Sequence, residues 1–210
     1  MPRPEQAWNT LERGNERFVG DVLEHPHQDA NRRRETASSQ HPIAAVFCCS
    51  DSRVSPETIF DLGLGDAFVI RNAGQVASSS ALGTLEYAVG LLSVPVLVVL
   101  GHESCGGVRA AIDSQAADAD PLPPHIADLI APIVPVVHAV TKTAAGAVID
   151  PTAVDAAEVG REHVRATIAE ILEQSPIISQ AVADGDLAIV GANYELSTGR
   201  VVPDAKVGLA

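Results

Sequence analysis

Five residues in two short segments have the types and the spacing of a metal site. Cys49, Asp51 and Arg53 lie within Cys-Ser-Asp-Ser-Arg-Val, and His102 and Cys105 lie within Gly-His-Glu-Ser-Cys-Gly-Gly-Val. Two thiols, one imidazole and one carboxylate are donors that zinc favours. Each segment follows an apolar run that is typical of a buried strand. If the two strands are neighbours, all four donors can meet at one ion.

The make-up of this cluster favours a reactive zinc site over a structural one. Structural sites are closed by four Cys or His ligands, whereas the fourth donor here is Asp51. Asp51 can bind the metal or form a bidentate pair with Arg53. Pairing would free a coordination position for a water, whose pKa zinc lowers to roughly 7, so that hydroxide forms at neutral pH. The backbone N–H groups of Gly106 and Gly107 could then hold a developing oxyanion.

Apolar runs predict the strands that position these donors. Their alternation with helix-like segments indicates an α/β fold, with a mostly parallel sheet of four to five strands covered by helices on both faces. The two ligand segments come just past the carboxyl ends of strands, where such sheets bind ligands at a switch point in strand order. We expect Cys105 on the first turn of the next helix, where the helix N-terminus favours thiolate. The strands are expected at Ile43–Cys48, Ala67–Ile70, Val94–Leu100 and Leu187–Val190, with a short edge strand at Val201–Val202.

Helix-like segments fill most of the remaining chain. Residues 24–41 are polar and are interpreted as a loop with room for a short helical piece. Thr152 with Asp155 three residues later resembles a capping box. Apolar residues near helical spacing predict an N-terminal amphipathic helix, and these are Trp8, Leu11, Phe18 and Val22. Further helices are expected at Ala81–Leu92, Cys105–Ser114, Ile126–Thr143 and Ala153–Glu173.

The bulk composition bounds the size, the partners and the location. The chain has 210 residues, enough for one domain, which we divide into an N-terminal helical arm (1–40) and an α/β core (41–210). A net charge of -13 repels phosphates, so neither nucleic acid nor a membrane is expected as a partner. The longest apolar stretch, Ala88–Leu100, is interrupted and too short to span a bilayer. With no export signal and three cysteines, we expect a cytoplasmic protein that uses cysteine for metal binding.

Two segments together resemble the signatures of a known family. Cys49–Val54 and His102–Gly107 resemble β-class carbonic anhydrases in residues, order and spacing. Similarities at Leu11–Phe18, Asp66–Gly74 and Leu85–Val89 extend the resemblance over most of the chain. Either signature alone would be weak, and the two together are strong.

The resemblance implies a zinc enzyme that interconverts carbon dioxide and bicarbonate. Attack by zinc-bound hydroxide would form bicarbonate, with one Zn²⁺ per chain. Cys49, His102 and Cys105 would be the permanent ligands. Asp51 would be the exchangeable ligand, paired with Arg53 in the active form. The sequence leaves open whether Asp51 lies on zinc or on Arg53.

The resemblance also implies residues that act between subunits. Gln40 matches a glutamine that family members lend to the active site of the neighbouring subunit. Phe68 and Tyr87 match aromatic residues of a narrow apolar pocket for a small, neutral, linear substrate, and plain core or interface packing fits both equally well. The family forms tight dimers that often pair into tetramers. We therefore expect a homodimer or homotetramer, with the N-terminal helix packing on a partner subunit.

An inhibitory bicarbonate site that some members carry is expected to be incomplete. Arg71 and Tyr194 match two of its residues, but Val46 stands at the position of its tryptophan. Cys48 precedes the ligand Cys49 and is interpreted as a packed core residue, ahead of a vicinal redox pair.

Two other functions stay open on the sequence. The same fold and metal could hydrolyse carbon disulfide or carbonyl sulfide. The chain could also be a catalytically silent zinc-stabilised scaffold or a bicarbonate-binding protein, against which Asp51, Arg53 and Gln40 argue. Histidines other than His102 are interpreted as serving surfaces, loops or ordinary hydrogen bonds.

Overall fold

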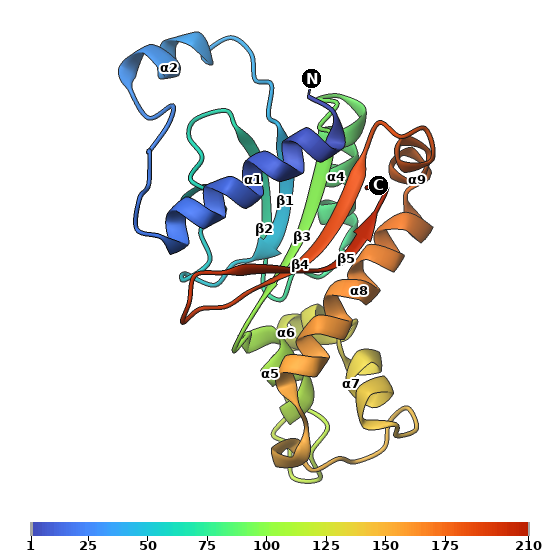
Figure 1. Ribbon diagram of the computed structural model, residues 1–210. Coiled ribbons are helices and arrows are strands. Elements are labelled where there is room, and N and C mark those ends of the chain that lie inside the picture. The colour runs from blue at the N-terminus through green and yellow to red at the C-terminus, as the bar shows by residue number, and fades with distance from the viewer. Residues whose placement is uncertain (1, 210) are drawn as a thin grey trace.

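Five strands form one sheet in the computed structural model, which describes residues 2–209 (Figure 1). The strand order is β2-β1-β3-β4-β5, and all neighbours are parallel except the antiparallel edge strand β5. The predicted α/β class and mostly parallel sheet are confirmed. The strands are β1 (Ala44–Cys49), β2 (Ala67–Asn72), β3 (Val96–His102), β4 (Ala188–Tyr194) and β5 (Val201–Val207).

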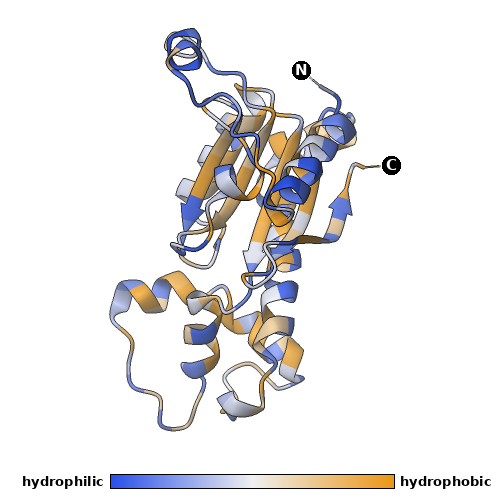
Figure 2. Ribbon diagram, turned by 60° about the vertical axis from the view of Figure 1, so that its left-hand side comes forward, coloured by the Kyte–Doolittle hydropathy of each residue, from blue (hydrophilic) through white to orange (hydrophobic). Residues whose placement is uncertain are grey.

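Helices cover both faces of the sheet, as the apolar strands predict. Side chains alternate between the faces of a strand, so Ala45 and Phe47 of β1 pack on one side and Val46 and Cys48 on the other. Figure 2 shows the apolar colour concentrated on the strands. The first face is covered by α4 (Ser79–Gly90), α8 (Ala156–Gln174) and α9 (Pro176–Ala183). The second face is covered by α1 (Pro4–Val19) and α3 (Pro56–Ile59).

The N-terminal helix packs on the sheet of its own chain. Trp8 and Leu11 of α1 are buried there, and α1 crosses the sheet in Figure 1. The helix ends at Gly20, and Asp21 then takes a left-handed φ of 54°. The expected position of Val22 on the apolar helix face is therefore wrong, because Val22 lies beyond the helix and is 63% exposed. The polar stretch that follows contains the short helix α2 (Ala30–Glu35).

A third group of helices lies beyond the carboxyl end of β3 (Figure 1). It contains α5 (Gly106–Asp113), α6 (Pro124–Ile130) and α7 (Val134–Thr141). The single helix expected over 126–143 is thus wrong. Pro135 lacks an N–H and fits only the first turn of a helix, so a new helix begins there.

The start of α8 also differs from the prediction. Pro151–Ala153 form a short 3-10 helix, and α8 begins at Ala156. Asp155 is itself the N-cap and accepts hydrogen bonds from the N–H groups of Ala157 and Glu158. The proposed capping box is wrong because the Asp155 carboxylate already fills the role assigned to Thr152.

No single helix within residues 2–209 has the length and apolar character to cross a membrane. The pair α6 and α7 reaches that length and composition only when taken together, with a bend of 51° between them. Both helices pack into the group around α5, where Ile130, Ile133 and Val137 are buried.

Candidate metal centre

Neighbouring strands bring the two ligand segments together. Strands β1 and β3 pair directly in parallel, with Cys48 opposite Leu100. Cys49 and His102 are the last residues of these strands, and Cys105 is the N-cap of α5. Cys49 and His102 were expected just past the ends of their strands and instead belong to them, and Cys105 precedes the helix on whose first turn it was expected. Their ligand atoms lie within 4.8 Å of one another, and all three side chains are buried.

The hydrogen bonds of His102 fix which ring nitrogen faces the other donors. Its Nδ1 lies 2.8 Å from the carbonyl oxygen of Glu103. A carbonyl can only accept, so Nδ1 carries the proton and Nε2 offers a lone pair. Nε2 is buried and has no hydrogen-bond partner among the described residues. A metal-ligating histidine usually donates a hydrogen bond from its other ring nitrogen to a carbonyl or carboxylate oxygen, as Nδ1 does here. The orphaned Nε2 therefore fits a metal ion.

The two thiols are coupled across a short distance. The sulfur atoms of Cys49 and Cys105 lie 4.0 Å apart. The Cys105 thiol holds the pKa of Cys49 well below its usual value, and the N–H of Gly74 adds to this by donating to the Cys49 sulfur at 3.3 Å. Cys49 is thus the first of the pair to ionise. A thiolate is the form that binds metal.

Cys48 has a different environment from its neighbour Cys49. Successive strand residues point to opposite faces, and Cys48 is fully buried in the cluster under α1. Burial raises its pKa to about 12. All three cysteines are free thiols, and Cys48 fits the interpretation of a packed core residue.

Asp51 is paired with Arg53 and stands apart from the three-donor group. Arg53 donates from Nε to Oδ1 at 2.9 Å and from Nη2 to Oδ2 at 2.7 Å, and its backbone N–H also donates to Oδ1. Arg53 holds the pKa of Asp51 well below its usual range. Arg53 also reaches the carbonyl of Ser104 at 3.4 Å, which links the two ligand segments. Three protein donors are the set found in catalytic zinc sites.

Backbone contacts hold the segment that carries Cys49 and Asp51. Arg71 donates from Nε to the carbonyl of Cys49 at 3.1 Å and from Nη2 to the carbonyl of Asp51 at 2.8 Å. The family resemblance relates Arg71 to an inhibitory site, together with Tyr194, which lies buried in β4. In this chain Arg71 ties β2 to the ligand segment.

Gly106 and Gly107 begin α5, where N–H groups have no intrahelical partner. A Cβ on Gly106 would meet no atom of another described residue within 4 Å, so the space on that side of its Cα is open. A Cβ on Gly107 would lie 3.1 Å from the Cα of Gly74 and 3.3 Å from its nitrogen. Gly107 therefore allows the loop after β2 to approach α5 closely, and Gly106 leaves room for a small ligand.

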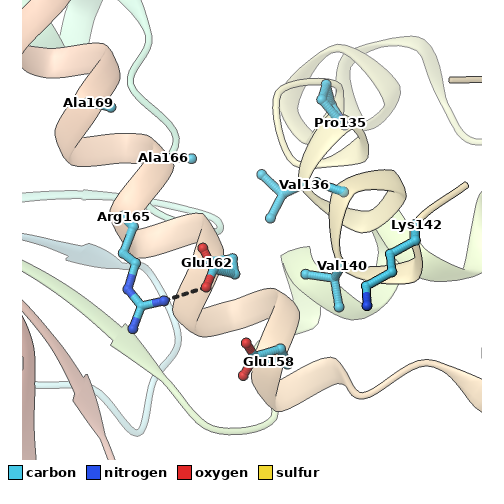
Figure 3. A pocket seen from close by; sticks show the side chains of 10 residues that line it. Pro135, Val136, Val140, Lys142, Glu158, Glu162, Arg165, Ala166 and Ala169 are labelled. Atoms are coloured by element: carbon cyan, nitrogen blue, oxygen red, sulfur yellow. Dashed lines mark hydrogen bonds and ion pairs between the residues drawn. The ribbon is translucent and has the colours of Figure 1, made fainter. Parts of the chain in front are cut away.

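A hollow of about 650 Å³ opens beside the donors, with His102, Cys105, Arg109 and Arg161 among its walls. A second hollow, of about 700 Å³, lies between α7 and α8 and contains none of the metal donors (Figure 3). Apolar side chains of both helices line it together with Lys142, Glu158, Glu162 and Arg165. The hollow between α7 and α8 is thus separate from the candidate metal centre.

Three residues expected at the active site lie elsewhere in this single chain. Phe68 of β2 stacks on Tyr87 of α4 with ring centroids 5.9 Å apart. Phe68 pairs with Ala45 in the sheet, four positions before the pair of Cys49 with Asn72. Tyr87 is 45% exposed, and Gln40 lies exposed outside regular structure. None of the three lines the described hollow beside His102.

Sequence reasoning missed two residues that support Cys49. Gly74 donates to its sulfur, and His163 of α8 contacts the carbonyl of Gly74 at 2.7 Å. The sequence offered a hint of the importance of Gly74, because this residue ends the Asp66–Gly74 segment that resembles the family. The sequence offered no such hint for His163, because no metal-ligand type of residue lies at short spacing from it.

Comparisons with known proteins agree with this geometry. The sequence profile of the family described as carbonic anhydrase matches residues 44–201. Carbonic anhydrase 2 of Mycobacterium tuberculosis is 42% identical over 206 residues, covering 98% of this chain and 95% of that one. A β-carbonic anhydrase of Coccomyxa, solved with acetazolamide, superposes with a TM-score of 0.66 at 26% identity, covering 83% of this chain and 78% of that one. One of two tetrameric β-carbonic anhydrases from Sordaria macrospora superposes with a TM-score of 0.71 at 24% identity, covering 83% and 86%.

The parallel sheet and its three-donor edge define a metal-dependent α/β protein. The family profile spans most of the chain, and the mycobacterial relative matches nearly all of it. The chain therefore belongs to the carbonic anhydrase family, in its β class.

Proposed function

We propose that the protein catalyses the reversible hydration of carbon dioxide to bicarbonate and a proton. The observation that carries this proposal is the buried trio of Cys49, His102 and Cys105, with the lone pair of His102 Nε2 facing the two sulfur atoms. These residues would hold one Zn²⁺ per chain. When bound, zinc lowers the pKa of a water to roughly 7 and so supplies a nucleophile at neutral pH.

Asp51 and Arg53 orient the attacking water. Because the pKa of Asp51 is held low by Arg53, Asp51 stays ionised and can only accept hydrogen bonds. Its role is to accept a hydrogen bond from the water and so aim the oxygen lone pair at the carbon of the substrate. Arg53 fixes the carboxylate in that position through both oxygens.

A backbone N–H at the start of α5 stabilises the negative charge that develops on the substrate. Gly106 directly follows Cys105 as the first residue of α5, where a backbone N–H has no intrahelical partner. A backbone donor placed at a developing oxyanion costs no reorganisation during the reaction. Its role is to donate to the oxygen of carbon dioxide that becomes anionic in bicarbonate.

The proposal includes a second subunit that completes the pocket. Gln40, Phe68 and Tyr87 do not line the hollow beside His102 of their own chain. Gln40 and Tyr87 are exposed, and Tyr87 stacks on the half-buried Phe68, which supports contact with a partner. The Sordaria proteins of the same fold are tetrameric. We assign this protein a homodimeric or homotetrameric state, in which α1 also contacts the partner. The three free thiols support a cytoplasmic location.

Stopped-flow hydration assays with zinc-loaded protein test the proposal. Activity should rise with pH between roughly pH 6.5 and 9, because the nucleophile forms with a pKa near 7. Parallel assays with carbon disulfide and carbonyl sulfide distinguish the alternative hydrolytic function. Zinc-loaded protein that turns over none of the three substrates would establish the silent scaffold instead.

A further inference from the structure

The loop after β2 has an unfavourable backbone next to Cys49. Gly74 has a φ of 79°, and Gln75, which is not a glycine, follows with a φ of 42°. Left-handed conformations are costly for residues with a Cβ and persist only when their surroundings enforce them. The side chain of Asn72 supplies part of this support, since it donates to the carbonyl of Val76 and accepts from its N–H.

This loop contacts the metal centre at two points. The N–H of Gly74 donates to the sulfur of Cys49 at 3.3 Å. The Cα of Gly74 lies where it would be only 3.1 Å from a Cβ on Gly107, at the start of α5. The position of Gly74 therefore sets both the hydrogen bond to a ligand sulfur and the packing of the helix that carries Cys105.

His163 supports Gly74 from the far side of the loop. The residue comes from α8, is 3% exposed, and places Nε2 at 2.7 Å from the carbonyl oxygen of Gly74. Because a carbonyl only accepts, Nε2 carries the proton and donates. Burial lowers the pKa of His163, which favours this neutral ring.

Ordinary core packing does not account for a histidine at this position. The Nδ1 atom of His163 is buried and has no hydrogen-bond partner among the described residues. An unpartnered buried acceptor destabilises a fold, so an apolar residue of the same size would pack better. His138, another buried histidine, has both ring nitrogens in contact with polar groups. The bond to Gly74 is what distinguishes His163.

We propose that His163 is a positioning residue that holds Gly74 so that the Gly74 N–H donates to the Cys49 thiolate, and that it thereby sets the strength with which Cys49 binds zinc. The inference rests on the proposed function of Cys49 as a zinc ligand. A hydrogen bond to a thiolate stabilises its lone pairs. Loss of the bond raises their energy and also frees the sulfur to move from its binding position.

Two substitutions of nearly equal length separate the hydrogen bond from packing. In His163→Gln the side-chain amide can reach the position of Nε2 and donate to Gly74. In His163→Met the chain fills similar volume without a donor. His138→Met is the matched control, because its hydrogen bonds go to Thr143, Gln115 and Gly146 and not to the metal centre.

Zinc affinity and the spectrum of the cobalt form are the measurements. Competition with a chelator should show roughly tenfold weaker zinc binding in His163→Met, as removal of outer-sphere contacts commonly causes. In Co²⁺-loaded protein, the sulfur-to-cobalt charge-transfer band should move to lower energy. His163→Gln should keep the wild-type band and affinity. His138→Met should lose stability and keep both.

The band position is independent of how much protein folds, because only folded, loaded protein contributes to it. A wild-type band and affinity in His163→Met would overturn the proposal, as would an equal shift in His138→Met. Neither readout depends on turnover. If the zinc-loaded wild-type protein proves inactive and the cobalt band of His163→Met still shifts, the proposed function is contradicted. The role of His163 is then still supported.

Discussion

Arg53 binds both carboxylate oxygens of Asp51, although only one residue separates them in the chain. The contacts run from Nε to Oδ1 at 2.9 Å and from Nη2 to Oδ2 at 2.7 Å, and the N–H of Arg53 donates to the same carboxylate. The Asp51 side chain is 15% exposed and that of Arg53 is 51% exposed, so the arginine covers a largely enclosed carboxylate from the solvent side. The sequence left open where Asp51 lies, and in this structure it lies on Arg53.

Replacing Arg53 by alanine should free Asp51 to bind the metal. We expect kcat/KM for hydration to fall by about 100-fold, the size of effect seen when one preorganised charge-stabilising group is removed. Stopped-flow assays at equal zinc content measure this. Arg53→Lys is the control that keeps the charge but loses the bidentate contact. Its kcat/KM should lie between those of the wild type and Arg53→Ala. Undiminished activity in Arg53→Ala would rule out the role assigned to the pair.

The stabilisation that the Asp51–Arg53 pair contributes should change with pH only at low pH. Arg53 lowers the pKa of Asp51 in the folded state, while an unfolded Asp titrates near pH 4. The stabilisation is therefore fully present above about pH 5 and is lost as pH falls below about 4 toward the folded-state pKa. The free energy of unfolding of zinc-free wild type and Asp51→Asn should differ by a constant amount above about pH 5. A difference that instead changes between neutral and alkaline pH would contradict this assignment.

The neighbours Cys48 and Cys49 should respond oppositely to substitution. Cys49→Ser replaces a zinc-binding thiolate, so the metal content measured by mass spectrometry should fall far below one ion per chain. Cys48→Ser leaves the donor trio intact but buries a hydroxyl under α1, costing about 1 to 3 kcal/mol of unfolding free energy. Zinc content should then stay near one per chain. Loss of zinc in folded Cys48→Ser would show that the two thiols act together.

Much of the fold follows from local sequence, and the convergence of the donors follows from the fold. Apolar strands such as Val96–His102 are buried on both faces, so their runs are visible in sequence. The wrong predictions arise where local patterns compete. At Pro135, for example, a proline divides an apolar stretch into two helices. The contact between His163 and Gly74 joins residues 89 positions apart, so no spacing rule reveals it. The roles proposed for Gln40, Phe68 and Tyr87 require a second chain, and the packing of one chain does not determine them.

The two glycines at the start of α5 should differ sharply when each is replaced by alanine. A Cβ on Gly107 would press on backbone atoms of Gly74 at 3.1 and 3.3 Å, and backbone gives way less easily than a flexible side chain. We expect Gly107→Ala to lower the free energy of unfolding by about 1 to 3 kcal/mol, as overpacking does. Zinc affinity should also weaken, because Gly74 donates to Cys49.

Gly106→Ala is the matched control for this overpacking. A Cβ on Gly106 would meet no atom of another described residue within 4 Å, and alanine restricts the unfolded chain more than glycine does. Stability should be unchanged or higher by up to about 1 kcal/mol, with wild-type zinc affinity. Chemical denaturation and chelator competition measure both quantities. Equal losses in the two variants would mean that the start of α5 tolerates no side chain at all, and that the approach of Gly74 to Gly107 is not the limiting contact.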